Sequence, residues 1–196
     1  MMSLEFELIK KSTEYSSGKL KNITKSNCPD LFFLNDFLYP PLMNKLVNFL
    51  ITTDIDWQVE IYQEQLNRLK LNWIPDSVIE EVHIVLENLT SELNQKFNRN
   101  NKFLGVTIWK DQEGYTIEKH NKDNSVIDIA LQLYLSENLV DLGTKFEYKD
   151  EIIQVNYRKN HGYLYDNSQG VPHYMSIPGP KEHIRYSLYA MWSNIT

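Results

Sequence analysis

Two histidines and an aspartate in the second half of the chain have side chains suited to metal chemistry. His120 and Asp123 lie in a predicted turn between two strands, and His173 follows a second turn at 170–172. Two imidazoles and one carboxylate form the facial ligand set that holds non-haem Fe(II) while leaving coordination positions open. These residue types therefore indicate an iron site made by His120, Asp123 and His173.

An arginine near the end of the chain could bind an anion. Arg185 offers a planar fork of N–H donors that grips a carboxylate through two hydrogen bonds. If a strand begins here, Arg185 and Ser187 point to the same face, because side chains alternate along a strand. We therefore expect the guanidinium and the hydroxyl to converge on one anion.

Each of these residues also has a structural interpretation without chemistry. A histidine in a loop is more often solvated or hydrogen-bonded than a metal ligand, and most arginines form ordinary ion pairs. His161 is a substitute ligand if His173 does not bind metal, but His161 and His183 are more simply structural or exposed. His83 falls within a predicted helix, where a packed position is expected.

Composition narrows the class of protein. The chain has 196 residues, which suits one domain, and its formal net charge of −6 disfavours a broad contact with nucleic acid phosphates. The single cysteine, Cys28, has no partner for an internal disulfide and no zinc-ligand spacing around it. A reducing, cytoplasmic location fits these observations.

Nothing in the sequence predicts a membrane protein. The first residues mix charged and apolar positions, unlike a signal peptide. The most apolar stretch, Ile127–Leu135, is too short to span a bilayer and contains Asp128 and Gln132. We therefore expect a soluble protein with no membrane partner.

The N-terminal half is predicted to be mainly helical. A short strand is expected at Leu31–Leu34, and a helix is expected to begin at Pro40-Pro41, where proline is tolerated in a first turn. A second helix follows Pro75, with Asp76 or Ser77 as its cap. Its apolar stripe has helical spacing and consists of Val78, Val82, Val85, Leu86, Leu89, Leu93 and Phe97.

From Phe103 the apolar pattern changes to the alternation of β-strands. Strands are expected at Phe103–Trp109, Gly114–Glu118, Ile127–Leu135, Thr144–Tyr148, Ile152–Tyr157, Gly162–Tyr165 and Ile184–Trp192. Helices followed by many short strands predict an α+β protein, a double-stranded β-helix (jelly roll) with supporting N-terminal helices. We expect one domain over 1–196, with 1–100 as mainly helical support and 101–196 as the jelly-roll core.

The order of these residues resembles the Fe(II)/2-oxoglutarate-dependent oxygenase family. The matching positions are Gly114-Tyr115, His120 with Asp123, the strand at 131–135, Gly143-Thr144, Gly162-Tyr163, His173 and Arg185-Tyr186-Ser187. The resemblance covers roughly 103–192, including the spacing of twelve residues from His173 to Arg185. The segment 31–38 resembles the start of the prolyl-hydroxylase-like branch.

The resemblance implies both cofactors and an activity. His120, Asp123 and His173 would hold Fe(II), and 2-oxoglutarate would chelate that iron while Arg185 holds its far carboxylate. Ser187 shares the face of Arg185, and Tyr134 is a candidate second partner of the far carboxylate. The enzyme would be a dioxygenase that consumes O2, forms succinate and hydroxylates a prime substrate, with ascorbate as a further cofactor that the resemblance allows.

One turn departs from the family pattern. The family spaces its first two ligands as His-x-Asp, whereas this chain reads His120-Asn121-Lys122-Asp123. We expect Asp123 to be the ligand, since a carboxylate neutralises Fe(II) better than an amide and since its distance to the strand ending at Leu135 fits the family. A one-residue bulge between His120 and Asp123 would accommodate both ligands.

Three functions from different classes remain open. The first is the iron and 2-oxoglutarate oxygenase, and the second is a catalytically impaired, cupin-like binding module with a degenerate metal site, which Asn121 favours. The third is a structural barrel whose histidines are incidental. For an enzyme, the prime substrate could be a protein side chain, a free amino acid or a small metabolite, with protein hydroxylation ahead because of the segment 31–38.

Overall fold

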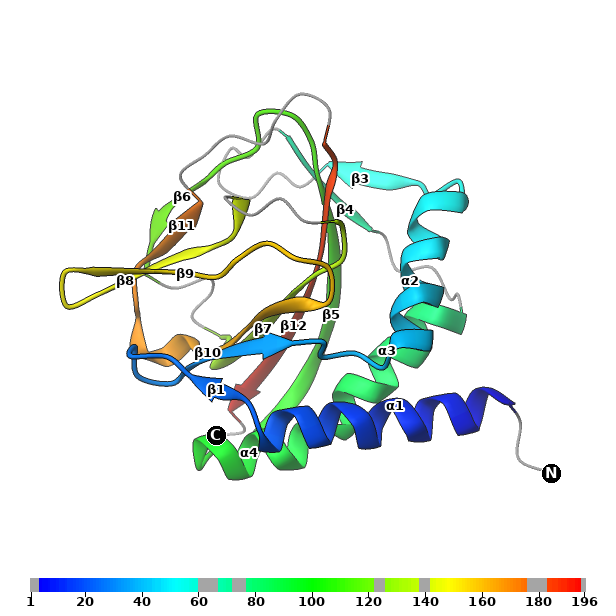
Figure 1. The fold of residues 1–196 in the computed structure, drawn as a ribbon, viewed down its shortest axis with the longest axis horizontal. Coiled ribbons are helices and arrows are strands. Elements are labelled where there is room, and N and C mark those ends of the chain that lie inside the picture. The colour runs from blue at the N-terminus through cyan, green and yellow to red at the C-terminus, as the bar shows by residue number, and fades with distance from the viewer. Residues whose placement is uncertain are drawn as a thin grey trace.

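In the computed structural model the chain forms two antiparallel β-sheets and a layer of helices (Figure 1). The structure describes residues 4–59, 67–71, 77–121, 126–137, 142–175 and 183–194. Within these ranges the α-helices are α1 (Leu4–Lys21), α2 (Pro40–Thr52), α3 (Ser77–Asn88) and α4 (Thr90–Phe97). None of the helices in these ranges is long and apolar enough to cross a membrane.

The larger sheet, called the major sheet here, contains eight strands among the described residues. In spatial order they are β1 (Thr24–Lys25), β2 (Leu31–Asn35), β10 (His161–Asp166), β7 (Ile129–Tyr134), β12 (Arg185–Asn194), β5 (Asn101–Asp111), β4 (Arg68–Leu71) and β3 (Trp57–Val59). The first half of the chain therefore contributes strands at both edges of this sheet, around a centre that comes from the second half.

The smaller sheet, called the minor sheet here, contains four strands among the described residues. Their order is β6 (Ile117–His120), β11 (His173–Met175), β8 (Lys145–Tyr148) and β9 (Glu151–Gln154). The ring of Phe146 on β8 packs 5.0 Å from that of Tyr163 and 5.5 Å from that of Tyr165, both on β10. The two sheets therefore face each other as in a jelly roll, which confirms the predicted fold class.

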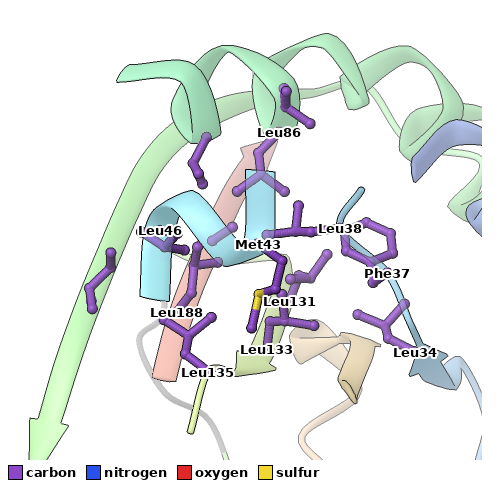
Figure 2. Packing of buried hydrophobic residues seen from close by; sticks show 14 of the residues in the cluster. Leu34, Phe37, Leu38, Met43, Leu46, Leu86, Leu131, Leu133, Leu135 and Leu188 are labelled. Carbon is purple, nitrogen blue, oxygen red and sulfur yellow. The ribbon is translucent and has the colours of Figure 1, made fainter. Parts of the chain in front are cut away.

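The outer face of the major sheet packs against the helices. Leu131 and Leu133 of β7 and Leu188 of β12 are buried together with Met43 and Leu46 of α2 (Figure 2). The alternate residues of the same strands, such as Ala130 and Tyr189, belong to a separate buried cluster between the sheets. Strand alternation thus divides the major sheet into an aliphatic outer face and an inner face that looks onto the minor sheet.

Several predicted elements are confirmed. The strand expected at Leu31–Leu34 is β2, and the helix expected at Pro40-Pro41 is α2, with its prolines in the first turn. The strand expected at Ile127–Leu135 is the fully buried β7. Ile127, at the start of the expected range, precedes β7 and lies in the inner cluster.

Two predictions about elements were wrong. The apolar stripe from Val78 to Phe97 does not form one helix, because the chain breaks at Leu89 and restarts as α4. The Thr90 hydroxyl, at the start of α4, accepts a 3.0 Å hydrogen bond from the Trp192 indole. This bond links α4 to β12. The strand expected at Gly114–Glu118 begins later, at Ile117, because Gly114 adopts a positive φ of 78° in a turn. Of the two expected caps, Asp76 lies outside the described residues, whereas Ser77 is the first residue of α3.

Helix α1 was not predicted from the sequence. Its buried positions are Ser12, Ser16, Ser17 and Leu20, so serines interrupt the apolar stripe that would reveal an amphipathic helix. The Ser16 hydroxyl instead donates to the backbone oxygen of Phe37, at 3.0 Å. Short polar contacts of this kind leave no periodic apolar signal.

Candidate functional site

The structure brings His120 and His173 together on neighbouring strands of the minor sheet. His120 is the last residue of β6 and His173 is the first of β11, and the two are direct partners in the strand register. Their ring centroids lie 4.2 Å apart. The sequence placed His120 in a turn and His173 directly after one, whereas each occupies a strand end, where strand pairing fixes its backbone.

Backbone contacts set the tautomer of both imidazoles. Nδ1 of His120 lies 2.8 Å from the backbone oxygen of Glu118, and Nδ1 of His173 lies 2.9 Å from that of Val171. A carbonyl oxygen only accepts, so each Nδ1 is the donor, and in a neutral ring the lone pair lies on Nε2. The Nε2 atom of His173 lies 3.5 Å from the Tyr165 hydroxyl. This is the arrangement in which a carbonyl orients a metal-binding histidine.

The third predicted ligand, Asp123, lies outside the described residues. The neighbouring Asn121 is described and is exposed. Within the described ranges, no group of three or more His, Cys, Asp or Glu side chains could hold a metal ion. The two histidines are therefore the part of the predicted ligand set whose arrangement is seen.

Arg185 lies deep on the inner face of the major sheet, at the start of β12, as predicted. Only 3% of its surface is exposed. Its Nε donates to Asp111 Oδ2 at 2.7 Å, and its Nη1 donates to the backbone oxygen of Leu142 at 2.9 Å and to the sulfur of Met175. Met175 lies two residues after His173 on β11. Arg185 therefore contacts the strand that carries one of the two imidazoles.

A second buried arginine completes this cluster and was missed at the sequence level. Arg68 on β4 donates from Nε to Asp111 Oδ1 at 2.7 Å and from Nη2 to Oδ2 at 3.2 Å. Its guanidinium carbon lies 4.0 Å from the ring centroid of Trp109 and 4.3 Å from that of Tyr115. Arg68 and Arg185 are both register partners of Asp111, so the three form one row across β4, β5 and β12.

The row has a definite charge state. Burial tends to raise the pKa of the Asp111 carboxyl group, but the charges and hydrogen bonds of Arg68 and Arg185 outweigh that tendency and lower the pKa. The carboxylate is therefore ionised between two cations. The three side chains together carry a formal charge of about +1 in a site with little access to water.

Ser187 lies beside this row with its hydroxyl buried. It is the register partner of Trp109 on β5 and of Tyr134 on β7, and its side chain is fully buried. Its Oγ, like Nη2 of Arg185, lacks a hydrogen-bond partner among the described residues. The Arg185 Nη2 atom lies 2.7 Å from Asp111 Oδ2 without hydrogen-bond geometry. Buried donors are normally paired, so these two atoms indicate a missing acceptor.

Tyr134 occupies the inner face of β7, as its predicted role requires. Its hydroxyl accepts from the backbone N–H of Thr144 at 2.9 Å and donates to Thr144 Oγ1 at 3.1 Å. Burial raises the pKa of this phenol, although the charge of Arg185 opposes the shift. Tyr134 is therefore a neutral hydroxyl whose hydrogen bonds are already made by Thr144.

The remaining histidines lie apart from this pair. His161 is half-buried, with Nδ1 2.9 Å from the backbone oxygen of Lys159, and His183 is exposed. The ring of His83 packs 4.8 Å from that of Phe103. The glycine after His161 has a structural cause, because a Cβ at Gly162 would lie 1.9 Å from the backbone oxygen of Gln132.

Comparisons with known proteins identify the fold. No family model matches the chain, and no curated protein matches it. Among solved structures, a prolyl-4-hydroxylase from Pseudomonas putida aligns with a TM-score of 0.68 at 14% identity, covering 92% of this chain and 100% of that chain. HygX from Streptomyces hygroscopicus, with nickel, 2-oxoglutarate and hygromycin B bound, aligns with a TM-score of 0.63 at 9% identity, covering 84% and 83%.

A third similar structure contains a peptide. It is a prolyl hydroxylase from Trichoplax adhaerens in complex with an oxygen degradation domain fragment of hypoxia inducible factor. It aligns with a TM-score of 0.59 at 11% identity, covering 99% of this chain and 94% of that chain. At such identities the likeness shows the fold, and the chain has the fold of the 2-oxoglutarate and Fe(II) oxygenases, the prolyl hydroxylases among them.

Proposed function

We propose that this protein is an Fe(II)- and 2-oxoglutarate-dependent dioxygenase that hydroxylates its prime substrate. The observation that carries the proposal is the arrangement across the jelly roll. Two neighbouring imidazoles lie on one sheet, and on the other lies a buried guanidinium beside a hydroxyl that has no hydrogen-bond partner among the described residues. The pairing of a metal-binding group with an anion-binding group suits a cosubstrate that is both a chelator and an acid.

The imidazole pair would hold the metal, with Asp123 as the third ligand. The carbonyls of Glu118 and Val171 fix each Nδ1 as a donor, which leaves Nε2 as the atom that would bind the metal. Fe(II) also prefers an anionic oxygen donor in its facial site. Asp123, three residues after His120, is the residue that we expect to supply it.

Arg185 and Ser187 would bind the far carboxylate of 2-oxoglutarate. Both present a buried donor atom that makes no hydrogen bond among the described residues, and a carboxylate would supply an acceptor for each. Tyr134 is the register partner of Ser187 and supports the same region through its hydroxyl. When bound, Fe(II) and 2-oxoglutarate supply the chemistry, in which one oxygen atom of O2 enters succinate, the other enters the prime substrate, and CO2 is released.

The aromatic residues of the inner face would exclude water from this site. The ring of Tyr157 lies 4.4 Å from that of Tyr134, and the ring of Phe146 stacks at 5.3 Å on that of His173. Burial raises the pKa of Tyr157, so this phenol also stays neutral. A dry, neutral lining strengthens the attraction between the arginine and an anionic ligand.

We favour a protein side chain as the prime substrate. Two of the similar structures are prolyl hydroxylases, and one of them holds a peptide. The segment 31–38, which resembles the start of that branch, forms β2 and the approach to α2. Hydroxylation of a peptide is therefore the first activity to examine.

The formation of succinate tests the proposal without knowledge of the prime substrate. The protein is incubated with Fe(II), ascorbate, O2 and 2-oxoglutarate, and we expect slow formation of succinate by uncoupled turnover. His173→Ala, which removes one proposed ligand, should give no succinate. Well-folded protein that binds no iron and forms no more succinate than a heat-killed control would contradict the proposed activity and support a binding module.

A matched pair of variants tests the carboxylate ligand. Asp123→Ala should abolish stable binding of Fe(II), because the two neutral imidazoles then lack an anionic partner. Asn121→Ala changes an exposed residue of the same turn and should leave metal affinity unchanged. Equal Fe(II) affinities of the two variants, measured by anaerobic titration, would show that Asp123 is not the ligand.

A further inference from the structure

The buried row of Arg68, Asp111 and Arg185 contains more positive charge than its internal pairing requires. The exposed fractions of these residues are 5%, 2% and 3%. Arg68 and Arg185 both form ion pairs with Asp111, and among the described residues neither arginine contacts another acidic residue. A buried charge without a partner is costly, so a net charge of about +1 here favours a bound anion.

The two oxygens of Asp111 are divided unequally. Oδ1 accepts from Nε of Arg68, whereas Oδ2 accepts from Nη2 of Arg68 and Nε of Arg185. Arg185 therefore contacts one oxygen only: its Nε donates to Oδ2, and its Nη2 lies 2.7 Å from the same oxygen without hydrogen-bond geometry and makes no hydrogen bond among the described residues. A guanidinium facing a carboxylate alone would take both oxygens in a bidentate pair.

Arg68 is held where it can maintain this division. Its guanidinium lies against the rings of Trp109 and Tyr115, and its strand β4 pairs with β5 beside Asp111. The two hydrogen bonds that its side chain makes among the described residues both end on Asp111. Arg68 thus acts on Asp111, and through it on Arg185.

We propose that Arg68 is a positioning residue for the acidic cosubstrate. By occupying Oδ1 of Asp111, it prevents a closed pair between Asp111 and Arg185 and so keeps Arg185 Nη2 and one unit of positive charge for the far carboxylate of the ligand. This inference rests on the proposed function, since it assigns that carboxylate to Arg185. It adds a second arginine, contributed by the first half of the chain, to a site whose other groups come from the second half.

A charge series tests this role. Arg68→Met leaves one cation and one anion, and Asp111 can then pair with Arg185 through both oxygens. The double variant Arg68→Met/Asp111→Asn restores a net charge of +1 through Arg185 alone. Binding of 2-oxoglutarate is measured by calorimetry with Ni(II) in place of iron, which prevents turnover, and folding is checked by thermal unfolding.

The ligand control is 2-oxopentanoate, which keeps the chelating end of 2-oxoglutarate and lacks its far carboxylate. We expect Arg68→Met to lower the affinity for 2-oxoglutarate about tenfold or more, which is the range for the loss of one charge-assisted contact. Its affinity for 2-oxopentanoate should stay within about twofold of the parent. The double variant should recover 2-oxoglutarate binding to within about threefold of the parent protein.

The failures of the inference and of the proposed function are distinguishable. If the parent protein binds no 2-oxoglutarate, the proposed function is wrong and the inference falls with it. If the parent binds it and Arg68→Met binds it equally well, only the role of Arg68 is overturned. Equal weakening of both ligands, or a double variant no better than the single one, would show that Arg68 is merely structural. If Arg68→Met fails to fold, the folded double variant decides, since the inference requires near-parent affinity from it.

Discussion

The two faces of the major sheet are made by the same strands but have opposite chemistry. The outer face of β7 and β12 presents Leu131, Leu133 and Leu188 to the helices, in a cluster of apolar side chains. The inner face presents Gln132, Ser187 and Arg185, and each of them has a buried polar atom without a partner among the described residues. The outer face of these strands is apolar, whereas the inner face has polar atoms to which the proposed ligand would bind.

This difference separates stability from function within single strands. Apolar burial stabilises a fold in proportion to the area removed from water, so the outer face should dominate the free energy of unfolding. Buried unpaired polar atoms cost stability and are retained where a ligand needs them. Substitutions on the two faces should therefore affect different measurements.

The largest effect is expected on the outer face. Leu131→Ala removes a fully buried side chain from the centre of β7 and should lower the free energy of unfolding by about 2–5 kcal/mol. Chemical denaturation measures this loss. Leu104→Ala, at a side chain that is 41% exposed on β5, is the control and should cost much less. Equal losses would mean that the helix-covered face does not carry the stability.

A smaller effect, on binding only, is expected at the inner face. Arg185→Met should lower the affinity for 2-oxoglutarate about tenfold or more, equivalent to about 1.5–3 kcal/mol, and should leave the affinity for the metal unchanged. The variant should fold, because Asp111 keeps Arg68 as its partner. Calorimetry compares it with Arg158→Met, which removes an exposed arginine. Unchanged affinity in Arg185→Met would refute the assignment of this residue.

The smallest effect is expected at Ser187, where substitution should lower the affinity for the ligand without lowering the free energy of unfolding. Ser187→Ala should weaken 2-oxoglutarate by about 1 kcal/mol, roughly fivefold, since one hydroxyl donor is lost. It should leave the free energy of unfolding equal or slightly higher, because a buried unpaired hydroxyl disappears. Ser193→Ala, at the far end of β12, should leave ligand affinity unchanged. A Ser187→Ala variant that loses stability and keeps its affinity would place the hydroxyl among structural groups.

The sequence predicted the parts of the molecule that leave a regular signal. Alternation along β7 and β12 identified both strands and the shared face of Arg185 and Ser187, and the order of motifs located His120 and His173. Strand pairing then supplied what the sequence lacked, namely that these two histidines are direct neighbours. Spacing along a chain says little about which strands pair.

The missed parts have weaker signals for physical reasons. Strand β4, Arg68–Leu71, is short and half charged, so neither its strand character nor the burial of Arg68 follows from an apolar pattern. Asp111 lies two residues beyond the predicted end of its strand, where a charged residue is ordinarily expected to face solvent. Both are buried because each neutralises the other, which is a tertiary effect.

The most direct test of the central claim is an anaerobic titration of the protein with Fe(II) and then with 2-oxoglutarate. The visible absorption of the iron chelate is followed together with the heat of binding. The account predicts one iron per chain, and a visible band that appears only when both components are present. It also predicts that the band is absent in His173→Ala and needs much more 2-oxoglutarate in Arg185→Met. Folded parent protein that takes up no iron, or binds 2-oxoglutarate equally well without metal, would contradict the account.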